Sequence, residues 1–144
     1  MGDRLRFTIL GCGSSGGVPR IGLEGPNWGA CDPGEPRNRR RRCALLVQRI
    51  GPEGRTTLLV DAGPDIRGQL IDAGEGWLDG VLITHEHADH LHGLDDLRMV
   101  VFNRREILPA YADATTSAVL RERFGYVFET PPGSHYPPIM SLTG

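Results

Sequence analysis

Four of the chain's five histidines lie in one segment, residues 85–92, which reads His-Glu-His-Ala-Asp-His-Leu-His. A short apolar run at residues 81–84 precedes it and is typical of a buried strand that ends there. Imidazole and carboxylate groups at this density are the ligands that zinc, manganese or iron prefer. The segment therefore predicts a metal site at the end of a buried strand.

Length, charge and cysteine content narrow the class of protein. The 144 residues suffice for one domain, and the net charge of −2 disfavours general binding to nucleic acid or a membrane surface. No apolar stretch approaches the roughly 20 residues of a membrane helix, and no secretory signal is expected. The three cysteines are widely spaced, which indicates reduced thiols and a cytoplasmic protein rather than a disulfide framework.

Short strands and helices are predicted to alternate along the chain, which indicates an α/β or mixed layered (α+β) fold. Apolar runs predict strands at residues 4–10, 43–50, 56–61, 80–84 and 107–111. Helical spacing predicts helices at residues 64–73, 93–104 and 113–124. Pro109 favours a sheet edge for the last strand, and Gly125 is expected just beyond the last helix, with Asp113 or Thr115 as its N-cap. No strand is expected in the proline-rich tail, residues 130–144.

A long irregular segment, residues 11–42, is typical of a functional or disordered loop. Gly11, Gly13 and Gly16 match the Gly-x-Gly-x-x-Gly pattern of dinucleotide sites, but Val18-Pro19 follows where that pattern requires a helix. We therefore expect a glycine loop close to the metal centre, where backbone amides could meet a phosphate.

The basic run Arg37–Arg42 has two interpretations. Arginines can grip phosphate or nucleic acid, or the run can be a solvated loop. Because no aromatic residues alternate with the arginines, an extended nucleic-acid surface is not expected.

The spacing within the histidine segment indicates two metal positions. His85 and His87 are two residues apart, so on an extended backbone their side chains point the same way. Asp89 and His90 follow where the chain bends toward a helix, and they can face a second point. In two-metal hydrolytic sites the ions lie roughly 3.5–4 Å apart, and a bound water ionises near neutral pH.

The pattern resembles a known family of enzymes. His85-x-His87-x-Asp89-His90 after an apolar strand resembles the signature of the metallo-β-lactamase-fold hydrolases, and Leu58–Gly63 resembles their first motif, a strand ending in Asp-x-Gly. The resemblance implies an αββα sandwich of two similar halves with metals at the seam.

The resemblance also implies roles for single residues. His85 and His87 would bind a first divalent ion, and Asp89 and His90 a second, with Zn²⁺ expected before Mn²⁺. Asp89 would also orient the metal-bound hydroxide and so act in catalysis. Asp61 would steady the ligand loop, as carboxylates behind metal-bound histidines do.

The resemblance narrows to a phosphodiesterase branch. Residues 11–19 and 42–47 are similar to tRNA 3′-processing endonucleases and to PhnP-like cyclic-phosphate phosphodiesterases, and residues 90–98 look more like the second group. It implies a hydrolase of small phosphodiesters. The alternatives are a tRNA-processing nuclease or thioester hydrolase on the same fold, and a non-catalytic half-domain that binds metal or a partner.

The chain falls short of the family's full set of ligands. A third histidine, a bridging aspartate and a last histidine are not found, and His135 in a Gly/Pro-rich loop is a poor match to the third. The extra zinc of some relatives needs closely spaced cysteines, and residues 25–33 of the early loop offer only Cys31. We therefore expect residues 1–144 to be one partial domain, the N-terminal half of the sandwich. It is expected to be inactive alone, with a C-terminal half or a homodimer partner missing.

Overall fold

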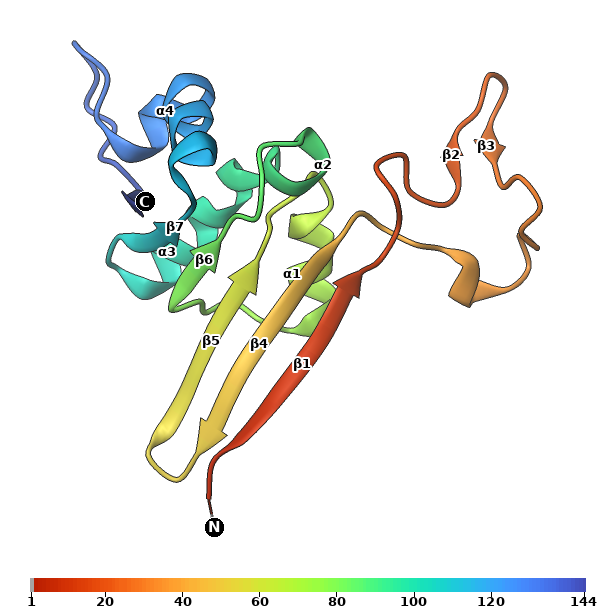
Figure 1. The fold of residues 1–144 in the computed structure, drawn as a ribbon, viewed down its shortest axis with the longest axis horizontal. Coiled ribbons are helices and arrows are strands. Elements are labelled where there is room, and N and C mark those ends of the chain that lie inside the picture. Colours follow the sequence, from red (N-terminus) through yellow and green to blue (C-terminus); the bar gives the residue numbers. More distant parts are fainter. Residues whose placement is uncertain (1) are drawn as a thin grey trace.

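The computed structural model describes residues 2–144 and contains one large mixed sheet with helices packed on one face (Figure 1). The six-stranded sheet has the order β1-β4-β5-β6-β7-β8, and β2 and β3 form a separate two-stranded sheet. The strands are β1 (Arg4–Gly11), β2 (Arg20–Ile21), β3 (Pro26–Asn27), β4 (Ala44–Gly51), β5 (Gly54–Val60), β6 (Gly80–Leu82), β7 (Leu108–Tyr111) and β8 (Met140–Thr143).

The helices connect the parallel strands. They are α1 (Ile66–Ala73), α2 (Ala88–Leu91), α3 (Arg98–Arg104) and α4 (Ala114–Phe128), with 3₁₀ turns η1 (Pro36–Asn38) and η2 (Leu94–Leu97). Strands β1, β4 and β5 are antiparallel neighbours, whereas β5 to β8 are parallel and need crossovers on the sheet face. None of these helices has the length and apolar character needed to cross a membrane, within the part of the chain described.

The two faces of the sheet differ in burial. Residues whose side chains point toward the helices form the core, among them Leu46, Leu59 and Val81. On β1, the alternate residues Leu5, Phe7 and Ile9 are 64%, 61% and 70% exposed. The layered α/β expectation is confirmed, and one helical layer on one sheet is what half of an αββα sandwich contains.

Two predictions for the C-terminal part were wrong. Strand β7 is not an edge, because β8 pairs with it on the side away from β6. Proline has no N–H to donate, but only Ala110 and Tyr111 of β7 are in register with β6. The hydrogen-bond ladder between β6 and β7 therefore does not need an N–H at Pro109. Strand β8 was not predicted at all; it begins after the prolines and buries Met140 to 1% exposure.

Helix α4 also runs past its predicted end. It continues three residues beyond Gly125 to Phe128, with non-helical backbone angles at Phe124. The additional turn buries Val127 and Phe128 in the core, which outweighs the local preference to stop at a glycine. The predicted N-cap Asp113 is confirmed, since its side chain accepts a hydrogen bond from the Thr116 amide at 2.8 Å.

Two glycines allow the loop after β5 to touch the backbone of α2. A Cβ atom at Gly63 would overlap the carbonyl oxygen of Asp89, and one at Gly93 would overlap that of Gly63. The Ala62 amide donates to the His90 carbonyl, and the Gly93 amide donates to the Ala62 carbonyl, both at 2.9 Å. The two segments are therefore fixed to each other by main-chain contacts.

We predict that Gly63→Ala destabilises the protein by about 1–3 kcal/mol, because the new methyl group overpacks this junction. The matched control is Gly125→Ala, where a Cβ meets no atom within 4 Å. It should be neutral or stabilising by up to about 1 kcal/mol, since alanine is the better helix former. Urea unfolding measures both; equal effects would contradict the close packing at Gly63.

Candidate metal centre

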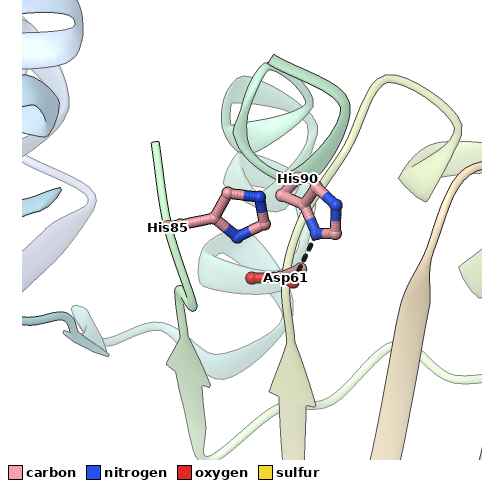
Figure 2. A group of neighbouring side chains, drawn as sticks. All are labelled: Asp61, His85 and His90. Atoms are coloured by element: carbon pink, nitrogen blue, oxygen red, sulfur yellow. Dashed lines mark hydrogen bonds and ion pairs between the residues drawn. The ribbon is translucent and has the colours of Figure 1, made fainter. Parts of the chain in front are cut away.

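Polar side chains gather where β5 and β6 end. Asp61 follows β5, and Thr84 and His85 follow β6 after Ile83. Because the two strands are parallel neighbours, their carboxyl ends meet at one edge of the sheet. The Asp61 amide donates to the Leu82 carbonyl at 2.8 Å, which continues the pairing past the last residue of β5. Figure 2 shows Asp61, His85 and His90 gathered at this edge.

Asp61 is a buried carboxylate with all of its partners in place. It is 5% exposed, and its Oδ1 accepts from the Thr84 amide at 2.7 Å. Its Oδ2 lies 2.7 Å from both Thr84 Oγ1 and His90 Nδ1. Its φ of 66° is in the left-handed region, which aspartate adopts more readily than most residues. Burial of a carboxylate without such partners would be very costly, so this network is what allows Asp61 to be buried there.

His90 is oriented for ligation by its contact with Asp61. With Nδ1 bonded to this carboxylate, the network assigns the proton to Nδ1 and leaves the lone pair on Nε2. Asp89 Oδ2 lies 3.2 Å from His90 Nε2. An imidazole nitrogen and a carboxylate oxygen thus converge on one point, an arrangement that suits a divalent cation.

The other two histidines of the motif lie beside His90. His85 Nδ1 is 2.8 Å from Thr84 Oγ1, and the His85 ring is centred 4.1 Å from His90 and 4.6 Å from His87. Asp61, His85 and His90 each offer a ligand atom within 4.8 Å of the others. Since Asp61 already accepts hydrogen bonds on both oxygens, its geometry suits an orienting carboxylate better than a direct ligand.

The structure thus brings His85, His87, Asp89, His90 and Asp61 to one end of the sheet, and their roles toward a metal stay predictions. The remaining histidine of the segment, His92, points elsewhere. Its ring packs against Phe124 at 5.5 Å between centroids, and its Nε2 lies 3.3 Å from Arg123 Nη1.

His135 lies outside the group that could hold a metal. It belongs to the irregular segment between α4 and β8, within the part of the chain that the structure describes. All three cysteines are free thiols, with Cys12 and Cys31 exposed and Cys43 partly buried.

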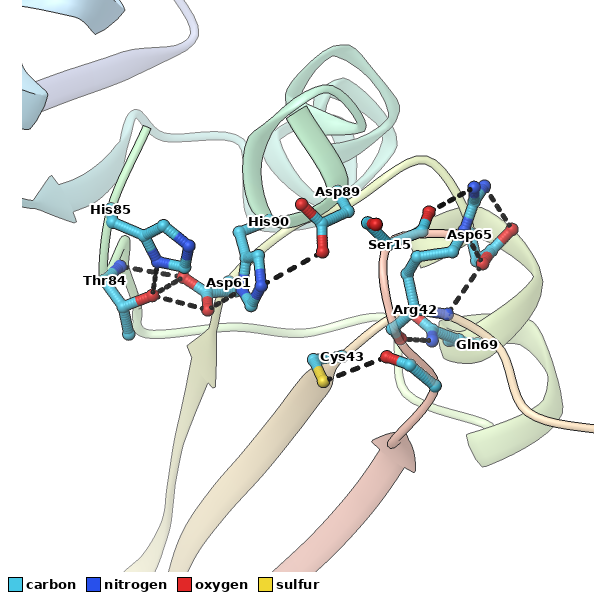
Figure 3. A network of polar contacts seen from close by, with 11 residues as sticks. Ser15, Arg42, Cys43, Asp61, Asp65, Gln69, Thr84, His85, Asp89 and His90 are labelled. Carbon is cyan, nitrogen blue, oxygen red and sulfur yellow. Dashed lines mark hydrogen bonds and ion pairs between the residues drawn. The ribbon is translucent and has the colours of Figure 1, made fainter. Parts of the chain in front are cut away.

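The glycine loop lies beside the motif residues, as Figure 3 shows. Cys43 Sγ contacts the Gly13 carbonyl at 3.4 Å. Burial, and to a lesser extent the nearby carboxylates of Asp89 and Asp61, raises the pKa of the Cys43 thiol, which is therefore neutral near pH 7. Two amides of this loop are already used within the fold, since the N–H groups of Gly13 and Gly17 donate to the carbonyls of Arg41 and Ser14.

Sequence reasoning missed two supports of the site. Thr84 bonds both Asp61 and His85, but a single threonine after a strand gives no motif signal. Asp65 holds Arg42 through contacts of 2.6 Å and 3.1 Å. Burial alone would raise the pKa of Asp65, but hydrogen bonds from the Arg42 side chain and amide hold it below its ordinary value.

Comparison with known proteins identifies the family to which the chain is similar. The model of the "Beta-lactamase superfamily domain" matches residues 56–141. The chain is 39% identical over 140 residues to an octanoyltransferase of Porphyromonas gingivalis, across 96% of the chain and 26% of that protein. It is 39% identical over 72 residues to ribonuclease Z of a Bradyrhizobium species, across 49% of the chain and 23% of that protein.

A solved structure is also similar. The crystal structure of a diphosphatase from the PhnP family superposes with a TM-score of 0.71 at 36% identity, across 87% of this chain and 49% of that one. The chain therefore spans about half of this structure and a smaller share of the two relatives in sequence.

We predict that Asp61→Asn weakens zinc binding by about 10–100-fold, because His90 loses the carboxylate that fixes its ring. Isothermal titration of Zn²⁺ into the folded variant measures this loss. The control Asp3→Asn removes an exposed carboxylate whose partner is Arg49 on the neighbouring strand β4. Zinc affinity equal to wild type in Asp61→Asn would show that Asp61 does not orient a ligand.

Proposed function

Because the chain belongs to the β-lactamase superfamily, we propose that it supplies the metal-binding part of a hydrolase that cleaves small phosphodiesters. One observation carries the proposal: His90 Nε2 and Asp89 converge at 3.2 Å while Asp61 fixes the opposite ring nitrogen of His90. A histidine positioned only for packing would not need Asp61 at its Nδ1 and a second carboxylate, Asp89, at its Nε2.

The donor set fits divalent cations. His85 with His87 would hold one ion, and Asp89 with His90 a second, through imidazole nitrogen and carboxylate oxygen. Zn²⁺ suits these donors best, and Mn²⁺ is the alternative. When bound, such ions lower the pKa of water and neutralise charge on phosphoryl oxygens.

The chain's own residues would position the reacting groups. Thr84 bonds Asp61 and His85, so one hydroxyl fixes parts of both metal positions. Asp89, whose side chain is 16% exposed, would accept a hydrogen bond from the attacking water at Oδ2. This contact would direct the oxygen of the water toward the phosphorus atom. The remaining ligands would come from outside residues 1–144.

We also propose that these residues act as a partial domain. The exposed apolar face of β1 offers a surface for a second sheet layer, which would complete the sandwich and bring the remaining ligands. The layer would come from further residues of the same protein or from a second copy. The share of the diphosphatase structure that this chain spans, 49%, supports this arrangement.

A second candidate substrate is a diphosphate. It is favoured by the 36% identity to a structure described as a diphosphatase. A tRNA-processing activity has weaker support, because the similarity to ribonuclease Z covers only 49% of the chain.

We expect residues 1–144 alone to hold fewer than two tightly bound divalent ions per chain, because three of the seven proposed ligands would lie outside these residues. Mass spectrometry of the metal content after dialysis measures this. His90→Ala should lower the content further, whereas His135→Gln removes a histidine outside the cluster and should leave it unchanged. Two stoichiometric ions in the chain alone would contradict the proposed partial site.

The substrate class is tested with the full-length protein that carries this chain. We expect turnover of small cyclic phosphates and bis(4-nitrophenyl) phosphate. His90→Ala should lose more than about 100-fold in kcat/KM, since removal of an outer partner alone costs about 10–100-fold. His135→Gln should retain full activity. Cleavage of diphosphates alone would favour the second candidate, and cleavage of precursor tRNA alone would contradict both.

A further inference from the structure

The arginine run is held in place by the glycine loop. The Val18 amide donates to the Arg40 carbonyl at 2.8 Å, and the Arg40 amide donates back to Val18 at 2.9 Å. The Gly13 amide donates to the Arg41 carbonyl at 2.7 Å. A Cβ at Gly13 would lie 2.5 Å from the Arg40 carbonyl oxygen, so only glycine permits this approach. The arginine backbone is therefore fixed, which a freely solvated basic loop would not be.

Three of the five arginines in the run have carboxylate partners, and the pairs of Arg41 and Arg42 hold the run against the rest of the fold. Arg42 pairs with Asp65 at 2.6 Å, and Arg41 pairs with Asp72 at 2.9 Å. The first pair is about a quarter exposed on each side, and Gln69 Nε2 bonds the Arg42 carbonyl at 2.8 Å. These contacts anchor the segment to α1 and the loop before it.

The other two arginines keep their charge available. Within residues 2–144, neither Arg39 nor Arg40 has a carboxylate within ion-pair distance. Arg39 lies 5.1 Å from the centre of the Trp28 ring, and Arg40 Nη1 is 2.8 Å from Cys12 Sγ. Both residues are exposed, so an incoming anion can reach them at little cost in desolvation.

These arginines line a cavity of about 610 Å³. Its walls are formed by the glycine loop, the arginine segment and two carboxylates, namely Gly16, Gly17, Val18, Pro19, Ile21, Arg39, Arg40, Arg41, Arg42, Asp65 and Asp72. Because both carboxylates are already paired, two positive charges remain unneutralised in the lining. The volume is in the range of about 300–1,000 Å³ typical of small-molecule sites.

The cavity adjoins the metal centre. Asp65, which lines it, follows Asp61 by four residues in the loop between β5 and α1. In Figure 3, Ser15 lies between the Arg42–Asp65 pair on one side and Asp89 and His90 on the other. Arg42 Nη1 contacts the Ser15 carbonyl at 3.5 Å. A molecule longer than one phosphate could contact both places.

We propose that this cavity binds a phosphate or diphosphate group at the non-reacting end of the substrate, with Arg39 and Arg40 as its ligands. The inference rests on the proposed function for the role of the anion, while anion binding itself does not depend on hydrolysis. Guanidinium groups bind phosphate oxygens through paired, charge-assisted hydrogen bonds. The cavity thus assigns a substrate class, a phosphodiester or diphosphate that carries a second phosphoryl group.

A small anion fits better than RNA. Arg39 and Arg40 lie in one cavity on a chain of net charge −2, and among the described residues Trp28 is the aromatic side chain seen to contact one of them. Proteins that grip single-stranded RNA have longer basic grooves lined by several aromatic side chains.

Binding is tested with inorganic pyrophosphate and inorganic phosphate in chelator, so that no metal at the histidines contributes. Isothermal titration of the folded full chain should show saturable binding that weakens with salt. Arg40→Gln should weaken pyrophosphate binding by at least about 10-fold, the loss expected for charged hydrogen bonds. Preference for pyrophosphate identifies a diphosphate group, and equal affinities identify a single phosphate.

The matched control is Arg37→Gln. It removes the same charge from the same run, but Arg37 pairs with Glu35 at 3.0 Å and does not line the cavity. Affinity should be unchanged. Equal losses in both variants, or no loss in Arg40→Gln, would overturn the site, as would an RNA oligonucleotide that binds more tightly and is not displaced by pyrophosphate.

Kinetics separate this inference from the proposed function. On a substrate with a second phosphate, Arg40→Gln in the full-length protein should raise KM about 10-fold and leave kcat nearly unchanged, because contacts to a non-reacting group act equally in ground and transition states. An unchanged KM would overturn the role in substrate binding. If nothing is hydrolysed but pyrophosphate still binds through Arg40, the proposed function fails and the anion site stands.

Discussion

The candidate site depends on one buried carboxylate. Asp61 accepts hydrogen bonds from the amide and hydroxyl of Thr84 and from His90, so one side chain joins the ends of β5 and β6 to helix α2. An ionised carboxylate at 5% exposure is stable only with such partners, and removal of any one leaves a charge poorly compensated. The same contacts that satisfy Asp61 determine which nitrogen of His90 faces Asp89.

Close main-chain packing places both functional segments at that edge of the sheet. Gly63 and Gly93 let the loop after β5 contact α2, and Gly13 lets the early loop contact the arginine segment. Side chains at these positions would separate the segments by the width of a methyl group or more. The glycine pattern after β1 thus has a steric purpose, although it matches a dinucleotide motif in sequence. In this fold the glycines bring backbones together, and the arginines and histidines on those backbones are the groups proposed to bind the anion and the metal.

Local sequence patterns predicted the parts of the fold that local forces determine. Apolar periodicity located β1, β4, β5 and α1 to within a few residues, and the motif spacing located the histidine cluster. The errors concern long-range pairing. Strand β8 forms because it pairs with the free edge of β7, and because the Ile139 amide just before it donates to the Val127 carbonyl in α4. Neither partner can be predicted from the four residues of β8 alone. Thr84 and Asp65 were missed for the same reason, since their partners lie 23 residues away.

The charges at this edge impose an order on substrate binding. Asp61 and Asp89 place negative charge where the reacting phosphoryl group would sit, and like charges a few ångströms apart repel strongly at low dielectric. Arg39 and Arg40 line the adjacent cavity and do not contact those carboxylates, so they cannot neutralise them directly. A phosphodiester would therefore gain contacts at the arginines first and would approach the histidines only when cations offset Asp89. The arginine cavity would thus give affinity for an anion in the absence of metal, whereas the histidine edge would attract an anion only once cations are bound there.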